Sequence, residues 1–178
     1  GSNRGEMTTS FAYQLPEHDG EGLEYGVDVR HSGYTGSSRP RRLALYEAFA
    51  GGRVADGRVR FRAGQLWLND LGSLGSVAGG TVEWRQPRPT PTASRVRLGV
   101  FGGLEPSILD IGVVPNVRKF GGYVTYEGEA ARRHTLGYVR VSNRSLVERS
   151  VLTTTNYWAA ARRVFFYQAM EYDLQAPA

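Results

Sequence analysis

Apolar and polar side chains alternate along most of this chain, and the alternation is clearest between residues 58 and 69. In that stretch the apolar positions are Val59, Phe61, Ala63 and Trp67, and the intervening positions include Arg58, Arg60 and Arg62. Successive side chains of a β-strand point to opposite faces of the sheet. A strand over these residues therefore separates an arginine face from an apolar face.

The same pattern recurs and predicts about ten strands, at residues 8–15, 23–30, 43–51, 58–69, 81–86, 95–101, 118–127, 133–142, 146–155 and 162–173. Many strands separated by turn residues are typical of barrels and sandwiches built from hairpins. The predicted fold is all-β, with mostly antiparallel strands and a closed barrel preferred over a sandwich. The length of 178 residues predicts a single domain over residues 1–178, or a piece of a larger barrel. Gly1-Ser2 is typical of a remnant of tag removal.

The alternation is less clear in several segments, and their secondary structure is predicted from other features. Residues 43–51 contain good helix formers, but strands flank them and they lead into Ala55-Asp56-Gly57, so we predict a strand and a hairpin. Residues 70–80 are rich in Gly and Ser and are predicted to be a connection. Residues 102–117 form the longest predicted irregular segment, with a turn of helix near 106–110. Phe-Gly-Gly-like segments at 49–52, 101–103 and 120–122 predict bends or close contacts within strands.

Composition narrows the chemistry of the chain. The net charge is +5, and of the 22 cationic residues only Lys119 is a lysine. Such a bias fits either anion recognition by planar guanidinium groups or the codon usage of a GC-rich genome. Cysteine is absent, which excludes disulfides and thiolate metal sites. No signal-peptide pattern and no apolar run of 18 residues is present, so a membrane-spanning helix is not expected.

Alternating strands of this length suit two environments, and the pattern alone leaves both open. In a soluble barrel or sandwich the apolar face points inward and the arginine face meets water. In an outer-membrane barrel the apolar face meets lipid, and small, polar and charged residues line the lumen. The two hypotheses differ in whether Val27, Phe61, Leu98 and Phe166 are exposed or buried.

Four segments carry a resemblance to a known class of proteins: residues 23–30, 58–69, 95–101 and 162–173, with aromatic residues near strand ends. These aromatics are Trp67, Trp84, Tyr126, Tyr157, Trp158 and Tyr172. The pattern resembles bacterial outer-membrane β-barrel proteins of the porin-like type. It departs from them where Glu47, Gln65 and Gln168 interrupt the apolar faces, since a lipid-facing polar group is costly. The chain also ends on Ala178, whereas these barrels usually end on an aromatic residue.

Two sets of residues are candidates for a functional site. The arginine positions predict an anion-selective lumen, because rings of arginine lower the barrier for anions; the alternative is an ordinary solvated strand face. These positions are Arg58, Arg60, Arg62, Arg95 and Arg97. The second set combines a few polar groups with aromatics, as ligand pockets do; the alternative is a hydrogen-bonded network or exposed strand ends. Its members are Glu47, Gln65 and Gln168 with Tyr46, Trp67 and Trp84.

Other chemistry is not predicted. The scattered His18, His31 and His134 have no chelating partner at short spacing, so no metal site is expected. Nucleic-acid binding is not expected, because aromatics and cations alternate onto opposite faces at 60–62 and 138–140. No catalytic group and no cofactor is expected either.

The resemblance implies a bacterial outer-membrane porin-like barrel that acts as a passive channel or an envelope structural component. Its partners are then the lipid bilayer, or detergent, and small anions. The alternative is a soluble β-barrel, cytoplasmic or periplasmic, that binds a small apolar or aromatic ligand. The sequence does not fix the oligomeric state.

Overall fold

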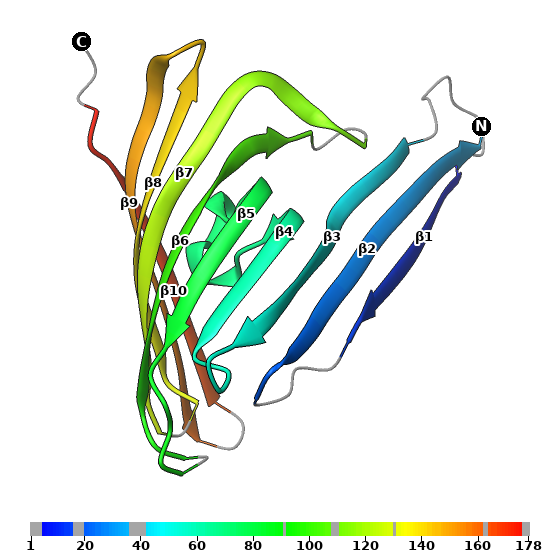
Figure 1. Cartoon of the computed structure of the whole chain (residues 1–178). Coiled ribbons are helices and arrows are strands. Elements are labelled where there is room, and N and C mark those ends of the chain that lie inside the picture. The colour runs from blue at the N-terminus through cyan, green and yellow to red at the C-terminus, as the bar shows by residue number, and fades with distance from the viewer. Residues whose placement is uncertain are drawn as a thin grey trace.

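The computed structural model describes residues 5–15, 20–35, 42–90, 92–107, 111–129, 131–161 and 164–175. Within these ranges ten antiparallel strands form one sheet in which each strand pairs with its neighbours in sequence (Figure 1). The strands are β1 (Gly5–Gln14), β2 (Gly22–Thr35), β3 (Arg42–Val54), β4 (Val59–Trp67), β5 (Ser76–Arg85), β6 (Arg95–Pro106), β7 (Val113–Glu127), β8 (Arg133–Asn143), β9 (Leu146–Ala161) and β10 (Val164–Asp173). The all-β, antiparallel prediction is confirmed.

The connections agree with the sequence in part. Residues 43–51 lie in β3 rather than in a helix, and Ala55 and Asp56 adopt positive φ in the hairpin turn to β4. The long irregular segment predicted at 102–117 is wrong, because β6 continues to Pro106, which pairs with Val113 at the start of β7. The predicted turn of helix near 106–110 falls partly on residues 108–110, which lie outside the described ranges.

A short 3-10 helix, η1 (Asn69–Leu74), replaces the connection predicted at 70–80. It lies between β4 and β5 and folds back onto the concave face of the sheet, where it contacts β7, β8 and β9 (Figure 1). Leu71 is fully buried, and Asp70 and Leu74 are buried beside it. The helix anchors the apolar part of the concave face, which consists of Phe49, Leu66, Leu68, Leu71, Leu74, Val77, Phe101, Tyr123, Val139 and Val151.

Glycines on the concave face allow large side chains to lie directly against neighbouring strands. A Cβ added to Gly99 would collide with the ring of Tyr123, and one added to Gly137 would collide with Leu71 of η1. A Cβ on Gly121 would meet the ring of Phe101 at 2.9 Å. Glycine in a strand often marks such a close approach. The close contacts predicted for the segments at 101–103 and 120–122 are therefore present.

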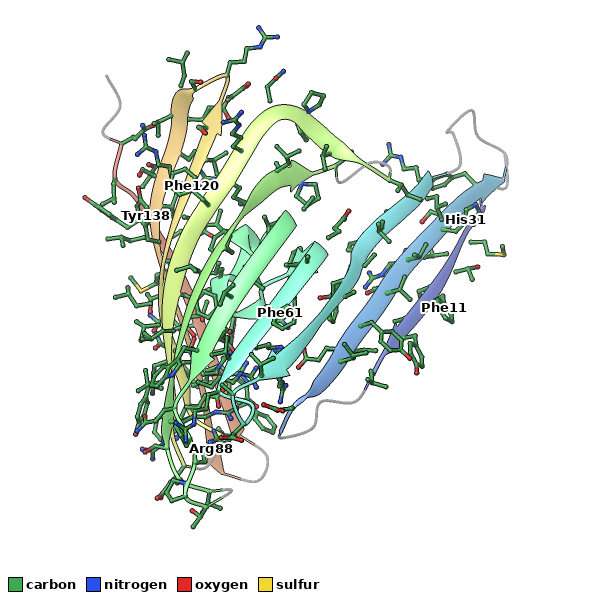
Figure 2. The ribbon with its side chains drawn as sticks, viewed as in Figure 1. Phe11, His31, Phe61, Arg88, Phe120 and Tyr138 are labelled. Carbon is green, nitrogen blue, oxygen red and sulfur yellow. The ribbon has the colours of Figure 1, made fainter. Side chains whose placement is uncertain are left out.

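The two faces of the sheet have opposite character. The convex face carries exposed apolar side chains, for example Phe61 (44% exposed), Leu98 (48%) and Phe166 (54%). Figure 2 shows this dense outer layer of side chains, including the labelled Phe61 and Phe120. The concave face carries the buried charged residues, of which Arg60 and Arg97 are 9% and 5% exposed. Two charged residues, Arg118 and Arg140, lie on the convex face beside Phe120. Alternation thus sorts the residues as the sequence predicts, with Arg60 and Arg97 inside.

The sheet is open in this structure. Among the described residues β1 pairs with β2 alone and β10 with β9 alone, and no pairing joins the two edges. Strands β4 to β10 curl around η1, whereas β1 to β3 extend away from the curl (Figure 1). The predicted closure of the barrel is therefore not supported by the strand pairing.

Candidate functional site

Charged side chains gather on the concave face, in the half nearest the β3–β4, β5–β6 and β7–β8 connections. Eight of those described in this half are no more than 9% exposed: Glu24, Arg53, Arg60, Asp70, Glu83, Arg85, Arg97 and Glu127. A ninth buried charge, Lys119, lies toward the opposite end, where it binds the Ser76 carbonyl and Glu105. They point inward because they occupy alternate positions of strands whose other positions are apolar. We call the carboxylates and arginines in this half the charged lattice. Burial of so many charges requires that they pair with one another.

Glu83 of β5 is one centre of the charged lattice. Its carboxylate accepts hydrogen bonds from Arg85 Nε at 2.5 Å and from Arg97 Nη1 at 2.6 Å. The Tyr123 hydroxyl donates a third, to Oε2, at 2.7 Å. Three donors from β5, β6 and β7 therefore fix one buried carboxylate. Hydrogen bonds to an ionised group are shorter and stronger than neutral ones.

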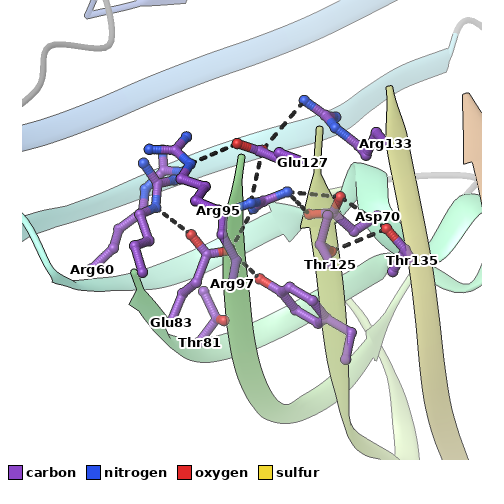
Figure 3. A network of polar contacts seen from close by, with 12 residues as sticks. Arg60, Asp70, Thr81, Glu83, Arg95, Arg97, Thr125, Glu127, Arg133 and Thr135 are labelled. Atoms are coloured by element: carbon purple, nitrogen blue, oxygen red, sulfur yellow. Dashed lines mark hydrogen bonds and ion pairs between the residues drawn. The ribbon is translucent and has the colours of Figure 1, made fainter. Parts of the chain in front are cut away.

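Arg97 of β6 joins this centre to two further carboxylates (Figure 3). Its Nη2 lies 2.9 Å from both carboxylate oxygens of Asp70. Its Nε lies 2.9 Å from Glu127 Oε1. One guanidinium thus bridges η1, β5 and β7. Because removal of one partner leaves the others buried and unpaired, the lattice holds η1 in place.

The remaining contacts of the lattice are made by Glu127 and by one more carboxylate, Glu24. Glu127 also accepts hydrogen bonds from Arg88 Nη2 at 2.7 Å and Arg95 Nε at 2.6 Å. Glu24 of β2 pairs with Arg53 and, at 2.6 Å, with Arg60 Nε. The lattice therefore spans the sheet from β2 to β7. Buried ion pairs of this kind fix geometry more reliably than they add stability.

The charged lattice borders a cavity of about 890 Å³, which lies below η1 on the concave face. Eight arginines and five carboxylates line it, so arginine is in excess. The arginines are Arg60, Arg62, Arg85, Arg88, Arg95, Arg97, Arg132 and Arg133, and the carboxylates are Glu47, Asp70, Glu83, Glu127 and Glu129. A concave surface with an excess of one sign raises the local concentration of the opposite ion. The residues that line the cavity therefore carry a net positive formal charge.

Of the arginines predicted as lumen residues, the structure brings four together. Arg60, Arg62, Arg95 and Arg97 all line the cavity. Arg58 is exposed in the turn before β4 and lines a separate hollow of about 360 Å³.

The predicted ligand pocket of polar and aromatic groups is not assembled. Glu47 lines the cavity, because it alternates with Phe49 and Arg53 of the concave face. The register shift in the β2–β3 pairing comes before it, so that Leu45 pairs with Val29 and no longer shares the face of Glu47. Gln65 lies on the convex face, where its amide donates to the Leu45 carbonyl. Trp84, 43% exposed, also lies on that face.

The remaining members of that predicted pocket are equally dispersed. Gln168 lies on the convex face and accepts a hydrogen bond from Asn156 Nδ2 at 3.4 Å. Trp67 borders the cavity at the end of β4, and its backbone N–H donates to Glu47 Oε1 at 3.5 Å. Tyr46 packs under the Arg30 guanidinium, 4.4 Å from the ring centroid.

Sequence reasoning missed the carboxylates that pair with the arginines. Glu83 and Glu127 were detectable, because each alternates with apolar neighbours on the same face as the arginines. Asp70 could not be detected in this way, since its pairing with Arg97 depends on where η1 lies in the folded chain.

Within the described residues no helix has the length and apolar character needed to cross a membrane. The described part of the chain also holds no group of three or more acidic or histidine residues placed to bind a metal ion.

Comparison with known proteins adds no relative. No family model matches the chain, and no curated protein or solved structure is similar to it. The function must therefore be inferred from the geometry of the two faces and the cavity.

Proposed function

We propose that the chain is an outer-membrane β-barrel of the porin-like type, a passive component of a bacterial envelope whose lumen admits small anions. The observation that carries the proposal is the inversion of the two faces. Large apolar side chains are exposed on the convex face while charged ones are buried on the concave face. Lipid accepts the first arrangement, and a polar lumen accepts the second.

Strand geometry supports the same proposal. The strands are 9 to 16 residues long, and a tilted crossing of the bilayer needs about 9–11 residues. Ten antiparallel strands joined in sequence order match the even-numbered meander of single-chain outer-membrane barrels. In the proposed membrane form β1 pairs with β10, which satisfies the edge groups that lipid cannot.

An aromatic belt gives further support. Five aromatic residues on the convex face lie close to the same end of the sheet, where β1, β5, β7 and β9 end and β2 begins. They are Tyr13, Tyr25, Trp84, Tyr126 and Trp158, each between 42% and 48% exposed. Tyr and Trp favour the boundary between lipid and water. Above this belt the outer face is mainly aliphatic, with Val82, Leu98 and Val100 in adjacent strands.

The soluble alternative expects the aliphatic face to be buried around an apolar ligand. Two observations oppose it, since the cavity is lined mainly by charged groups and the apolar stripes face outward. The polar Gln65 and Gln168 on the convex face are the observation in its favour. The first test is refolding with and without detergent, followed by partitioning. The proposal expects a folded protein only in detergent or vesicles, with heat-modifiable gel mobility. A monodisperse β-rich protein in buffer alone would refute it.

Passage through the lumen is expected to be limited by η1, since the apolar part of the concave face surrounds it. Asp70→Ala removes both hydrogen bonds from Arg97 Nη2. In planar bilayers the wild-type protein is expected to conduct weakly and this variant to conduct more. Ser73→Ala removes only the contact with Glu171 near the rim and serves as the control. Equal conductance of Asp70→Ala and wild type would contradict the role of η1.

A further inference from the structure

We propose that Arg62 anchors a binding site for one small, water-soluble oxyanion, a carboxylate or a phosphate, within the cavity. The inference rests on the proposed function and deepens it, because it names the class of solute that the charged half of the lumen holds. It depends on four observations: the pairing of Arg62, its surroundings, the charge of the cavity and the chemistry of the guanidinium.

Arg62 differs from the other arginines of β4 and β6 in what it contacts. Arg60 pairs with Glu24, and Arg97 pairs with three carboxylates. The Arg62 Nε is buried and has no hydrogen-bond partner among the described residues. Its guanidinium lies over the Phe49 ring, 5.3 Å from the centroid. Strand β4 therefore places Arg60 in an ion pair with Glu24 and leaves Arg62, two residues later, without an ionic partner among the described residues.

The surroundings of Arg62 offer it no sufficient partner within the chain. In the strand pairing Arg62 lies opposite Gly51 on one side and Thr81 on the other. The Thr81 hydroxyl already donates to the Val100 carbonyl at 3.1 Å. Glu47 attracts Arg62 electrostatically but makes no ion pair with it in the described part of the chain. Its carboxylate accepts the Trp67 N–H instead.

Arg62 is partly buried, and its buried Nε without a partner among the described residues costs free energy that an anion from outside the chain would offset. Arg62 lines the cavity, whose excess of arginine draws anions toward it. A guanidinium presents donors in a planar fork that matches the oxygens of a carboxylate or phosphate. The Phe49 ring supports the opposite side of the guanidinium and holds the fork in one orientation.

The cavity also limits the kind of anion that fits. Its volume of about 890 Å³ accommodates a small metabolite-sized molecule. Charged residues are the most numerous in its walls, and Trp67, Tyr157 and Tyr167 add aromatic surface. The occupant is therefore a compact molecule that carries at least one oxyanion group.

The test is calorimetric titration of the full chain, folded in a neutral detergent, with inorganic phosphate and with citrate. The wild-type protein is expected to bind one equivalent of at least one of these anions. Arg62→Gln is expected to weaken that binding at least tenfold. Arg58→Gln, at the exposed turn of the same strand, is the matched control and is expected to bind as the wild type does.

A thermal measurement separates a binding role from a structural one. Without added anion, Arg62→Gln is expected to be at least as stable as the wild type, because it removes an unpaired charge. Phosphate or citrate is expected to raise the Tm of the wild type and not that of the variant. Equal anion affinity in both proteins, binding of neither anion by the wild type, or a less stable variant without anion would overturn the inference.

The outcome is separable from that of the proposed function. A chain that inserts into vesicles but binds neither anion through Arg62 refutes only the oxyanion site. A chain that is folded in buffer and binds phosphate through Arg62 refutes only the membrane barrel.

Discussion

An arginine placed on the convex face distinguishes a lipid-facing surface from a water-facing one. Val100 is 62% exposed at the middle of β6, opposite Val82 and Gly122. Arginine near the middle of a bilayer destabilises a membrane barrel by about 2–4 kcal/mol. That cost lowers the folding equilibrium constant roughly 30- to 700-fold. On a surface that faces water, the same change is expected to alter stability by no more than about 0.5 kcal/mol.

Val96→Arg is the matched control on the same strand and face. Val96 lies beside Tyr126 of the aromatic belt, four residues from Val100. At about 3.3 Å per residue and a tilt near 40°, the two positions differ by about 10 Å in depth. Arginine near the interface costs only about 0–1 kcal/mol. A larger loss of stability at Val100 than at Val96 is the result that identifies the convex face as lipid-facing.

Both variants are measured by reversible urea unfolding after refolding into phospholipid vesicles, with tryptophan fluorescence as the signal. The expected result is a loss of about 2–4 kcal/mol for Val100→Arg and at most about 1 kcal/mol for Val96→Arg. Equal, small effects at the two positions would refute the assignment of the convex face to lipid. Large losses at both would indicate a packing role that the exposure of Val100 does not suggest.

Two further substitutions test the concave face, each measured by the same urea titration. Gly137→Ala places a methyl group against Leu71 and is expected to lower the free energy of unfolding by about 1–3 kcal/mol through overpacking. Gly80→Ala is the control, because its added methyl group meets only ordinary contacts, and it is expected to be neutral or slightly stabilising. Equal effects of the two substitutions would contradict the packing of η1 against Gly137. Tyr123→Phe removes one of three donors to Glu83 and is expected to cost about 1.5–3 kcal/mol; an unchanged midpoint would mean that water replaces the hydroxyl.

The strands, and the residues that share a face of each strand, could be predicted from the sequence because both depend on the alternation of neighbouring residues. The stretch at 58–69 predicted which residues share a face, and Arg60 and Phe61 do lie on opposite faces. Which face meets which solvent is not local information, since the same alternation serves a soluble barrel. The register shift that separates Leu45 from the face of Glu47 was also hidden, because a bulge depends on how two strands pair.

The helix η1 was hidden for a different reason. Its sequence, NDLGSL, is that of a turn, and nothing near it indicates burial. Leu71 is buried because Gly137, 66 positions along the chain, leaves room for it. The Asp70 carboxylate finds Arg97 in the same way. Such contacts depend on how strands β4 to β10 curl around the segment, which the local sequence does not reveal.

The position of η1 in the chain has a practical consequence. Although it occupies the concave face, it is the loop of a single hairpin, and the Leu68 N–H donates to the Gly75 carbonyl at 2.8 Å across its base. The chain therefore enters and leaves the segment at one point, beside two strands that already pair with each other. An exchange of residues 69–74 for a two-residue turn is therefore expected to keep the order of the strands, while it removes the Asp70 partner of Arg97 and the buried Leu71. The strands that form the wall and the segment that fills the concave face are thus separate parts of the chain.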